Sequence, residues 1–136
     1  IFRFKPETSP QPPLERQSGL PQTTLLIQGN SLGVIVSPLP EKEAILWDLA
    51  ERYEFDYNLL YSLWACESQN RHAGVWGDNY KSYGGFQFQL PTWVAYNKLF
   101  GTELNMLSFR DQAELAILIL QKGDWQNWRN CLDKHF

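Results

Sequence analysis

The sequence has no long hydrophobic run and no basic cluster, and these two absences exclude whole classes of function. No apolar stretch in its 136 residues approaches the roughly 20 residues needed to cross a bilayer, so we expect no membrane span. Lysine and arginine number 12 against 15 acidic residues, giving a net charge of −3. No Lys/Arg cluster is present that could track a phosphate backbone. Nucleic acid is therefore not expected as a partner.

Cysteine and histidine are also scarce, with two of each. Cys66 and Cys131 are either free thiols, the default in a reducing compartment, or a pair, which would imply export. If paired, they close a loop over nearly the whole C-terminal domain. His72 and His135 lack the spacing of Cys, His or Asp metal ligands. We therefore expect no metal and no cofactor, and we expect both histidines at the surface.

Proline is nearly absent after residue 40, and this divides the chain. Seven of the eight prolines fall in residues 1–40, which predicts a Pro-rich linker or wrapping segment there and a compact domain over 41–136. Within the first part, the apolar runs 25–27 and 32–36 indicate a hairpin or one strand-like segment. The chain begins with Ile1 and shows no signal-peptide pattern, so we expect a mature or excised form.

The second part is predicted to be mainly helical. Helical patterns occupy 41–53 and 57–66, the latter capped by Asp56, and Pro91 and Gly101 bracket a helix over 92–100. Ser108 caps a buried central helix that runs over 112–120 and stops at Gly123. A short helix follows over 125–132. Residues 69–89 are predicted to be loop, with a short strand or helix start over 86–90. The tryptophans in helical patterns are expected in the core: Trp47, Trp64, Trp125 and Trp128.

Glu67 is the candidate for acid–base chemistry. Cleavage of a glycosidic bond requires a carboxylic acid that protonates the leaving oxygen, and an apolar setting raises the pKa of such a group. Glu67 follows an apolar helix and opens into a Gly- and Asn-rich loop, where backbone groups can approach a bulky saccharide. For an arbitrary glutamate, a solvated helix end would be the preferred interpretation.

Several ordered blocks between residues 42 and 133 change that preference. These six blocks are the lead-in Ala50–Leu60, Cys66-Glu67-Ser68, Tyr83-Gly84-Gly85-Phe86-Gln87-Phe88, Thr92-Trp93, Ser108-Phe109-Arg110-Asp111-Gln112, and Trp125, Trp128 and Cys131 as Trp-x-x-Trp-x-x-Cys. In these blocks the chain resembles the soluble lytic transglycosylases and, more closely, the resuscitation-promoting factors of the lysozyme superfamily. The chain departs from the pattern at Arg129, where that family commonly has proline, and in the loop between Glu67 and Tyr83.

The resemblance implies a mainly α, α+β lysozyme-like fold with an active-site cleft and a single catalytic acid/base, Glu67. Gln87 would line the cleft and bind substrate, Tyr83 and Trp93 would help form its walls, and Cys66 would pair with Cys131. The substrate would be the glycan strands of peptidoglycan, cut between N-acetylmuramic acid and N-acetylglucosamine. We expect a monomer that is secreted or attached to the cell wall, where it could meet cell-wall proteins.

Two enzymatic interpretations differ in whether a second carboxylate acts together with Glu67. Asp78 is the only carboxylate in the central loop and could partner Glu67 in a lysozyme-type hydrolase, or could cap a turn with Asn79, which we favour. With Glu67 alone, the chain would be a lytic transglycosylase. A catalytically idle glycan- or partner-binding module is a third interpretation, and residues 1–40 could regulate access to the cleft. The candidate aromatic platforms for sugar rings are Trp76, Tyr80, Tyr83, Trp93 and Tyr96.

Overall fold

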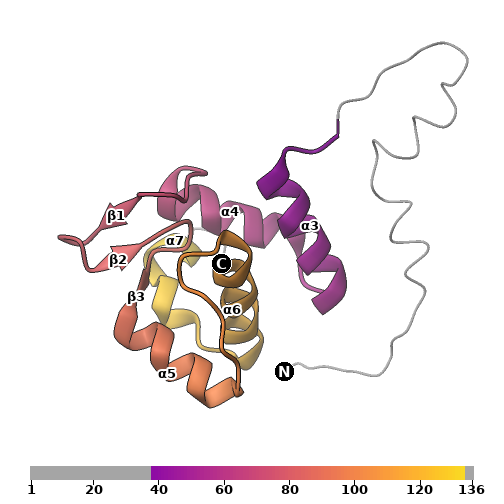
Figure 1. Ribbon diagram of the computed structural model, residues 1–136. Helices are drawn as coiled ribbons and strands as arrows, with labels where there is room; N and C mark the ends of the chain where they lie inside the picture. The colour runs from indigo at the N-terminus through magenta and orange to yellow at the C-terminus, as the bar shows by residue number, and fades with distance from the viewer. Residues whose placement is uncertain (1–37, 134–136) are drawn as a thin grey trace, which may run out of the picture.

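Helices make up most of the chain that the computed structural model describes, which is residues 38–133. They are α3 (Glu41–Tyr53), α4 (Tyr57–Ser68), α5 (Leu90–Phe100), α6 (Phe109–Lys122), the 3-10 helix η2 (Trp125–Trp128) and α7 (Arg129–Leu132). Between α4 and α5 lies a small antiparallel sheet of β1 (Trp76–Gly77), β2 (Ser82–Tyr83) and β3 (Phe88–Gln89), in that order (Figure 1). This agrees with the prediction of a mainly helical domain. The predicted hairpin over 25–36 and most of the Pro-rich segment lie outside the described residues, as does His135.

The helix ends follow the capping residues that the sequence predicted. The Asp56 carboxylate accepts hydrogen bonds from the backbone N–H groups of Asn58 and Leu59 at the start of α4. The Ser108 hydroxyl accepts one from Asp111 N–H at the start of α6. Such caps satisfy N–H groups that have no partner within the helix. Gly101 and Gly123 end α5 and α6 in the left-handed conformation, as expected.

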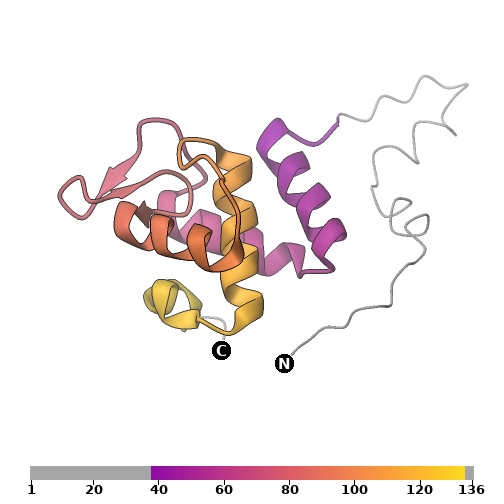
Figure 2. The ribbon, with the colours of Figure 1, turned by 60° about the horizontal axis from the view of Figure 1, so that its bottom comes forward.

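Helix α6 is the centre of the core. It packs against α3 and α5, while α4 packs against α3 and α7 (Figures 1 and 2). Its side chains are buried on nearly every side, as predicted for residues 112–120. Trp64 and Trp128 belong to this core, and Trp47 is half-buried. The same expectation was wrong for Trp125, which is exposed because it begins η2 at the surface.

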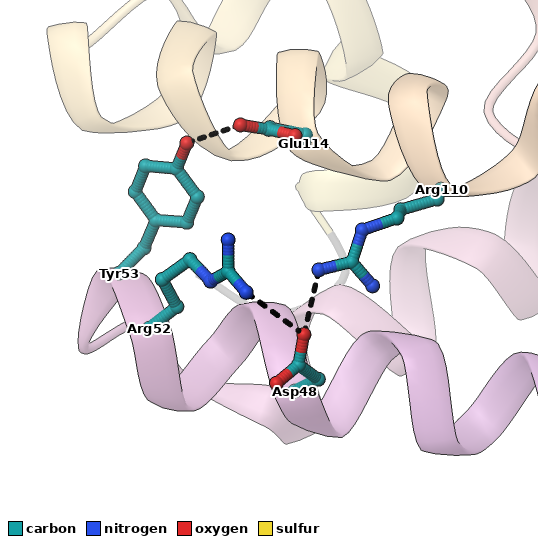
Figure 3. A network of polar contacts seen from close by, with 5 residues as sticks. All are labelled: Asp48, Arg52, Tyr53, Arg110 and Glu114. Carbon is teal, nitrogen blue, oxygen red and sulfur yellow. Dashed lines mark hydrogen bonds and ion pairs between the residues drawn. The ribbon is translucent and has the colours of Figure 1, made fainter.

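A polar network joins the outer helix α3 to α6 (Figure 3). The Asp48 carboxylate accepts hydrogen bonds from Arg110 at 2.6 Å and from Arg52 at 3.5 Å. The Tyr53 hydroxyl donates to Glu114. Desolvation and the negative charge of Glu114 raise the pKa of Tyr53 to about 12. Because the Asp48 ion pairs face solvent, they contribute little stability; the buried apolar face of α6 holds the helices together.

The sheet was not predicted, because residues 69–89 were expected to be mostly loop. Its register pairs Trp76 with Tyr83 and Gly77 with Ser82, then Tyr83 with Phe88. Strands of two residues are too short to show the alternation of apolar and polar side chains that reveals a strand. Within residues 38–133, no helix combines the length and apolar character needed to span a membrane.

Candidate active site

Glu67 lies in the last turn of α4 and is partly buried. A disulfide between the preceding residue, Cys66, and Cys131 links this turn to α7. The pairing implied by the family resemblance is therefore present, and the alternative of two free thiols is excluded. The carboxyl group is thus held where α4 meets the end of the domain.

The residue after Glu67 fixes the path by which the chain leaves α4. The buried Ser68 hydroxyl accepts a hydrogen bond from Arg71 N–H and donates one to the Arg71 carbonyl at 2.8 Å. The Trp64 indole N–H donates to the same carbonyl at 2.9 Å. Gln69 and Asn70 both adopt left-handed backbone conformations in this bend. Ser68 and Trp64 therefore fix the bend by which the chain leaves α4 directly after Glu67.

A pocket of about 400 Å³ opens beside Glu67. Its walls come from the end of α4, the β1–β2 turn, strand β3, the start of α5 and the η2–α7 segment. Most of the lining side chains are polar and uncharged, so they offer hydrogen bonds to a hydroxyl- and amide-rich ligand such as a sugar. The lining residues are Glu67, Asp78, Ser82, Gln87, Phe88, Gln89, Thr92, Gln126, Asn127, Trp128, Arg129 and Asn130.

Burial raises the pKa of Glu67 to about 7, with a smaller contribution from the negative charge of Asp78. Removal from water disfavours the ionised carboxylate, and a nearby like charge acts in the same direction. Near neutral pH, Glu67 therefore exists as a mixture of acid and carboxylate. A group in this state can give up a proton and then take one back.

Asp78 lies across the same pocket, in the turn between β1 and β2. Its carboxylate accepts a hydrogen bond of 2.6 Å from the Ser82 hydroxyl. Asp78, Asn79 and Tyr80 are three consecutive residues with positive φ, between 50° and 69°. Asp78 thus belongs to a turn with Asn79, as we favoured, and it also faces the Glu67 pocket. The two interpretations of Asp78 are not exclusive in this structure.

The turn between β2 and β3 carries Gln87 into the pocket, and Gln112 of α6 holds that turn. The fully buried Gln112 amide accepts a hydrogen bond from Phe86 N–H and donates to the carbonyls of Tyr83 and Met106. Gly84 has φ +87°, and a Cβ there would lie 2.5–2.9 Å from the Gln112 amide. The Gln87 side-chain N–H groups donate to the carbonyls of Val75 and Gly84. Gln87 is therefore fixed in place by its two amide hydrogen bonds.

His72 is buried, so the expectation of a surface histidine was wrong. Its relative exposure is 7%. Its Nε2 lies 2.8 Å from the Leu107 carbonyl, and its Nδ1 accepts a hydrogen bond from Gly85 N–H. This pairing requires the neutral ring, with its proton on Nε2. Burial, the largest cause, lowers the pKa of His72. Its role is to support the turn that carries Gln87.

None of the five candidate aromatic platforms is among the described lining residues of the Glu67 pocket, so the expectation that Tyr83 and Trp93 form its walls was wrong. Trp76 and Tyr80 are 51% and 79% exposed on the β1–β2 hairpin, with ring centroids 6.2 Å apart. Tyr83 is buried next to Trp76, and its hydroxyl accepts a hydrogen bond from Gly74 N–H. Trp93 is only 5% exposed, with its indole N–H on the Leu104 carbonyl, so burial rules it out as an open sugar platform.

Tyr96 is next to the Glu67 pocket without lining it, because its hydroxyl accepts a hydrogen bond from the lining residue Asn127. Its hydroxyl donates to Asp124 at 2.6 Å, and its ring stacks on Phe100. Trp93 was expected in the site because Thr92-Trp93 matches a block of the family pattern, and Tyr96 was expected there as a further aromatic platform for sugar rings. Only the first turn of their helix reaches the pocket, where Thr92 contributes to the lining.

Sequence reasoning missed the wall formed by η2 and α7. Trp128 was expected in the core, yet it both packs there and lines the pocket, with its indole N–H on the Phe86 carbonyl at 2.9 Å. Gln112 was also missed as the support of the β2–β3 turn. The available signal was an amide side chain on the face of α6 that is otherwise buried and apolar, because such a buried amide must be hydrogen-bonded.

The described part of the chain contains no group of three or more His, Cys, Asp or Glu side chains that could hold a metal ion. No protein-family model, curated protein or solved structure matches the chain.

Proposed function

We propose that this protein cleaves the β-1,4 bond between N-acetylmuramic acid and N-acetylglucosamine in peptidoglycan, as a lytic transglycosylase with Glu67 as its one acid/base. The observation that carries the proposal is the Glu67 carboxyl, partly buried in a polar pocket with its pKa raised to about 7. A general acid needs a pKa near the working pH. We also propose that the fold is lysozyme-like.

The resemblance gains weight because its separate blocks meet at one place. Four of the six blocks line the pocket: Cys66-Glu67-Ser68 supplies Glu67, Tyr83–Phe88 supplies Gln87 and Phe88, Thr92-Trp93 supplies Thr92, and the last block supplies Trp128. Gln112, which ends the Ser108–Gln112 block, holds the turn that carries Gln87. Blocks that are distant in sequence and shared with one family would have no reason to meet around a carboxyl group if Glu67 were an ordinary helix-end residue.

The chemistry follows from the protonated Glu67. Its proton passes to the glycosidic oxygen as the bond from C1 to that oxygen breaks, which leaves Glu67 as a carboxylate. The N-acetyl group of the muramoyl sugar stabilises the positive charge that develops at C1. The C6 hydroxyl of the same sugar then attacks C1 and returns its proton to Glu67. The product is a 1,6-anhydro sugar, and no water is consumed.

The disulfide supports a location outside the reducing cytoplasm. Disulfides persist in oxidising compartments and are rare in the cytosol, and the Cys66–Cys131 bridge lies directly beside Glu67. We therefore propose a secreted or cell-wall-associated protein. That location is also where a peptidoglycan-cleaving enzyme meets its substrate.

A lysozyme-type hydrolase is the second candidate, and the observation that favours it is the position of Asp78. Asp78 and Glu67 are the two carboxylates among the pocket-lining residues, and the charge of Asp78 acts on Glu67. In a hydrolase, a second carboxylate stabilises or attacks the sugar, or activates water. In the transglycosylase, Asp78 only helps to keep Glu67 protonated.

Product analysis on purified peptidoglycan tests these proposals. Wild type is expected to release 1,6-anhydro muropeptides, detected by mass spectrometry as products lacking one water relative to hydrolysis. Glu67→Gln is expected to lose this activity by a factor of 10³ or more, on the order expected when the general acid is removed along with the base. Asp78→Asn should reduce the rate by less than about tenfold, because it alters only the protonation of Glu67.

Other outcomes would select the alternatives. Reducing ends in place of anhydro ends, with equal losses for Glu67→Gln and Asp78→Asn, would identify a hydrolase. If wild type and Glu67→Gln both bound glycan and neither cleaved it, the protein would be a glycan-binding module. Deletion of residues 1–40 in parallel tests whether that segment limits access, since unchanged activity would remove that hypothesis.

A further inference from the structure

Arg129 is the one arginine in residues 38–133 without a partner. Arg52 and Arg110 both bind the Asp48 carboxylate. Arg71 donates from its guanidinium to the Ser68 carbonyl. Arg129 has no ion pair, side-chain hydrogen bond or ring contact within the described chain, and it is exposed. Its guanidinium is therefore available to a ligand.

The position of Arg129 is more informative than its exposure. It lines the Glu67 pocket, and it also lines a second hollow of about 400 Å³ formed with Trp125, Leu132 and Asp133. Gln126 is the other residue shared by the two hollows. The two hollows therefore adjoin along the η2–α7 segment, with Arg129 where they meet.

The positive charge of Arg129 favours one class of ligand group, the anions. The Glu67 pocket contains two carboxylates, and Arg129 is the only cation among its described lining residues. A substrate group drawn to Arg129 would be anionic, and a planar carboxylate matches the forked donors of a guanidinium.

We propose that Arg129 binds a carboxylate carried by the muramoyl side chain of the substrate, and so selects muramoyl glycans over glycans made of N-acetylglucosamine alone. This inference rests on the proposed function, because it assumes that a muramoyl sugar occupies the Glu67 pocket. Two parts of the substrate carry such a carboxylate. In strands without peptides the lactyl group ends in a free carboxylate, and in strands with peptides the carboxylates belong to the stem peptide, which the second hollow would receive.

Binding measurements on the Glu67→Gln background test the inference without turnover. Three ligands distinguish the sources: N-acetylglucosamine tetramer, which has no carboxylate; amidase-treated glycan strands, which carry the lactyl carboxylate; and strands that retain their stem peptides. Each is titrated by calorimetry against Glu67→Gln alone and against the same protein with Arg129→Ala, Arg129→Lys or Arg52→Ala added. Arg52→Ala is the matched control, because it removes an exposed arginine on α3, away from both hollows.

Arg129→Ala is expected to weaken binding about tenfold for one or both carboxylate-bearing ligands, and to leave binding of the tetramer unchanged. Arg129→Lys should recover part of the loss, and the loss should shrink at high salt because it is electrostatic. Loss on treated strands alone would identify the lactyl group, and loss on peptide-bearing strands alone would identify the stem peptide.

Three results would overturn the inference: no loss on either carboxylate-bearing ligand, an equal loss on the tetramer, or an equal loss from Arg52→Ala. Failure of the inference is distinguishable from failure of the proposed function. If wild type forms anhydro products while Arg129→Ala binds every ligand normally, only the inference fails. If wild type cleaves nothing while Arg129 governs binding of carboxylate-bearing strands, the enzymatic proposal fails and the binding site stands.

Discussion

At the scale of single residues, Glu67 carries a free-energy cost that depends on pH. In the folded protein its pKa is about 7, against an ordinary value of 4.5. Below pH 4.5 the side chain is protonated in both the folded and unfolded states, so it costs nothing. As the pH rises from 4.5 to 7, the unfolded chain releases the proton first, and the folded state becomes less stable relative to it. Above pH 7 the full cost remains.

Glu67→Gln is therefore expected to stabilise the protein at alkaline pH and not at acidic pH. The shift in pKa corresponds to about 3 kcal/mol, and partial exposure of the carboxyl reduces this to about 2 kcal/mol. Urea unfolding of both proteins at pH 4 and pH 8.5 measures the difference. A variant that is no more stable than wild type at pH 8.5 would show that Glu67 ionises without cost, and would remove the main support for its role as an acid.

Gly84 offers a second test at this scale, because Gly74 is a matched control. Both glycines have positive φ, but a Cβ at Gly74 meets no atom within 4 Å, whereas one at Gly84 meets the Gln112 amide. Gly74→Ala should cost about 1 kcal/mol for the backbone conformation alone. Gly84→Ala should cost about 3 kcal/mol, because the buried amide must also move. Equal costs in denaturant unfolding would contradict the close contact between Gly84 and Gln112.

At the scale of elements, one helix organises the short strands and turns beside it. The side chain of Gln112 on α6 binds three backbone groups, in the β2–β3 turn and the segment before α6. Strands of two residues contribute few hydrogen bonds of their own, and sheets this small are marginal in isolation. The stability of the pocket wall therefore comes largely from α6.

Gln112→Ala should be strongly destabilising. It leaves the Phe86 N–H and the Tyr83 and Met106 carbonyls without these partners and opens a cavity, with an expected cost of about 3 kcal/mol or more. Gln121→Ala is the control, because Gln121 lies on the same helix and its amide also donates to a carbonyl, that of Tyr53, but at the surface. That change should cost less than about 1 kcal/mol. The free energies of urea unfolding of the two variants decide the point, and equal values would contradict the role given to Gln112.

The helices were predictable from sequence because their signals are local. Asp56, Ser108, Gly101 and Gly123 act on residues within one turn of themselves, and α6 shows a continuous buried run. The β1–β2–β3 sheet was not predictable, because its strands are two residues long and the side chain that holds the β2–β3 turn, Gln112, lies more than 20 residues away from Phe86 and Tyr83.

The candidate site was also predictable only in part. Glu67 was identified through neighbouring motifs, and Gln87 was placed with it. The surroundings of aromatic and histidine side chains were not predictable: Trp93 and His72 are buried because Leu104 and Leu107, later in the chain, offer carbonyls to their ring nitrogens. The sequence alone does not state which ring faces inward.

At the scale of the whole molecule, the Cys66–Cys131 disulfide joins two positions 65 residues apart. Cross-linking residues at this separation restricts the unfolded chain and stabilises the folded state by about 4 kcal/mol. The Cys66→Ala, Cys131→Ala double variant should lose roughly this amount and should also bind glycan more weakly, because α7 carries the pocket wall. Thermal unfolding with and without a thiol reductant measures the effect.

The double variant is its own control for the reductant. Wild type should fall to the stability of the double variant on reduction, whereas the double variant should be unaffected. If reduction left wild type unchanged, the bridge would contribute nothing to stability. If it destabilised the double variant equally, the reductant would be acting elsewhere.

The same bridge also affects when the pocket forms during synthesis of the chain. A chain that leaves a ribosome or a membrane channel N-terminus first presents Glu67 well before Trp128 and Cys131 have emerged. Until then it has the acid without the wall that Trp128 provides and without the cross-link to Cys131. If the chain is threaded through a membrane, the pocket is completed only on the far side, so the nascent protein has no complete pocket inside the cell that makes it.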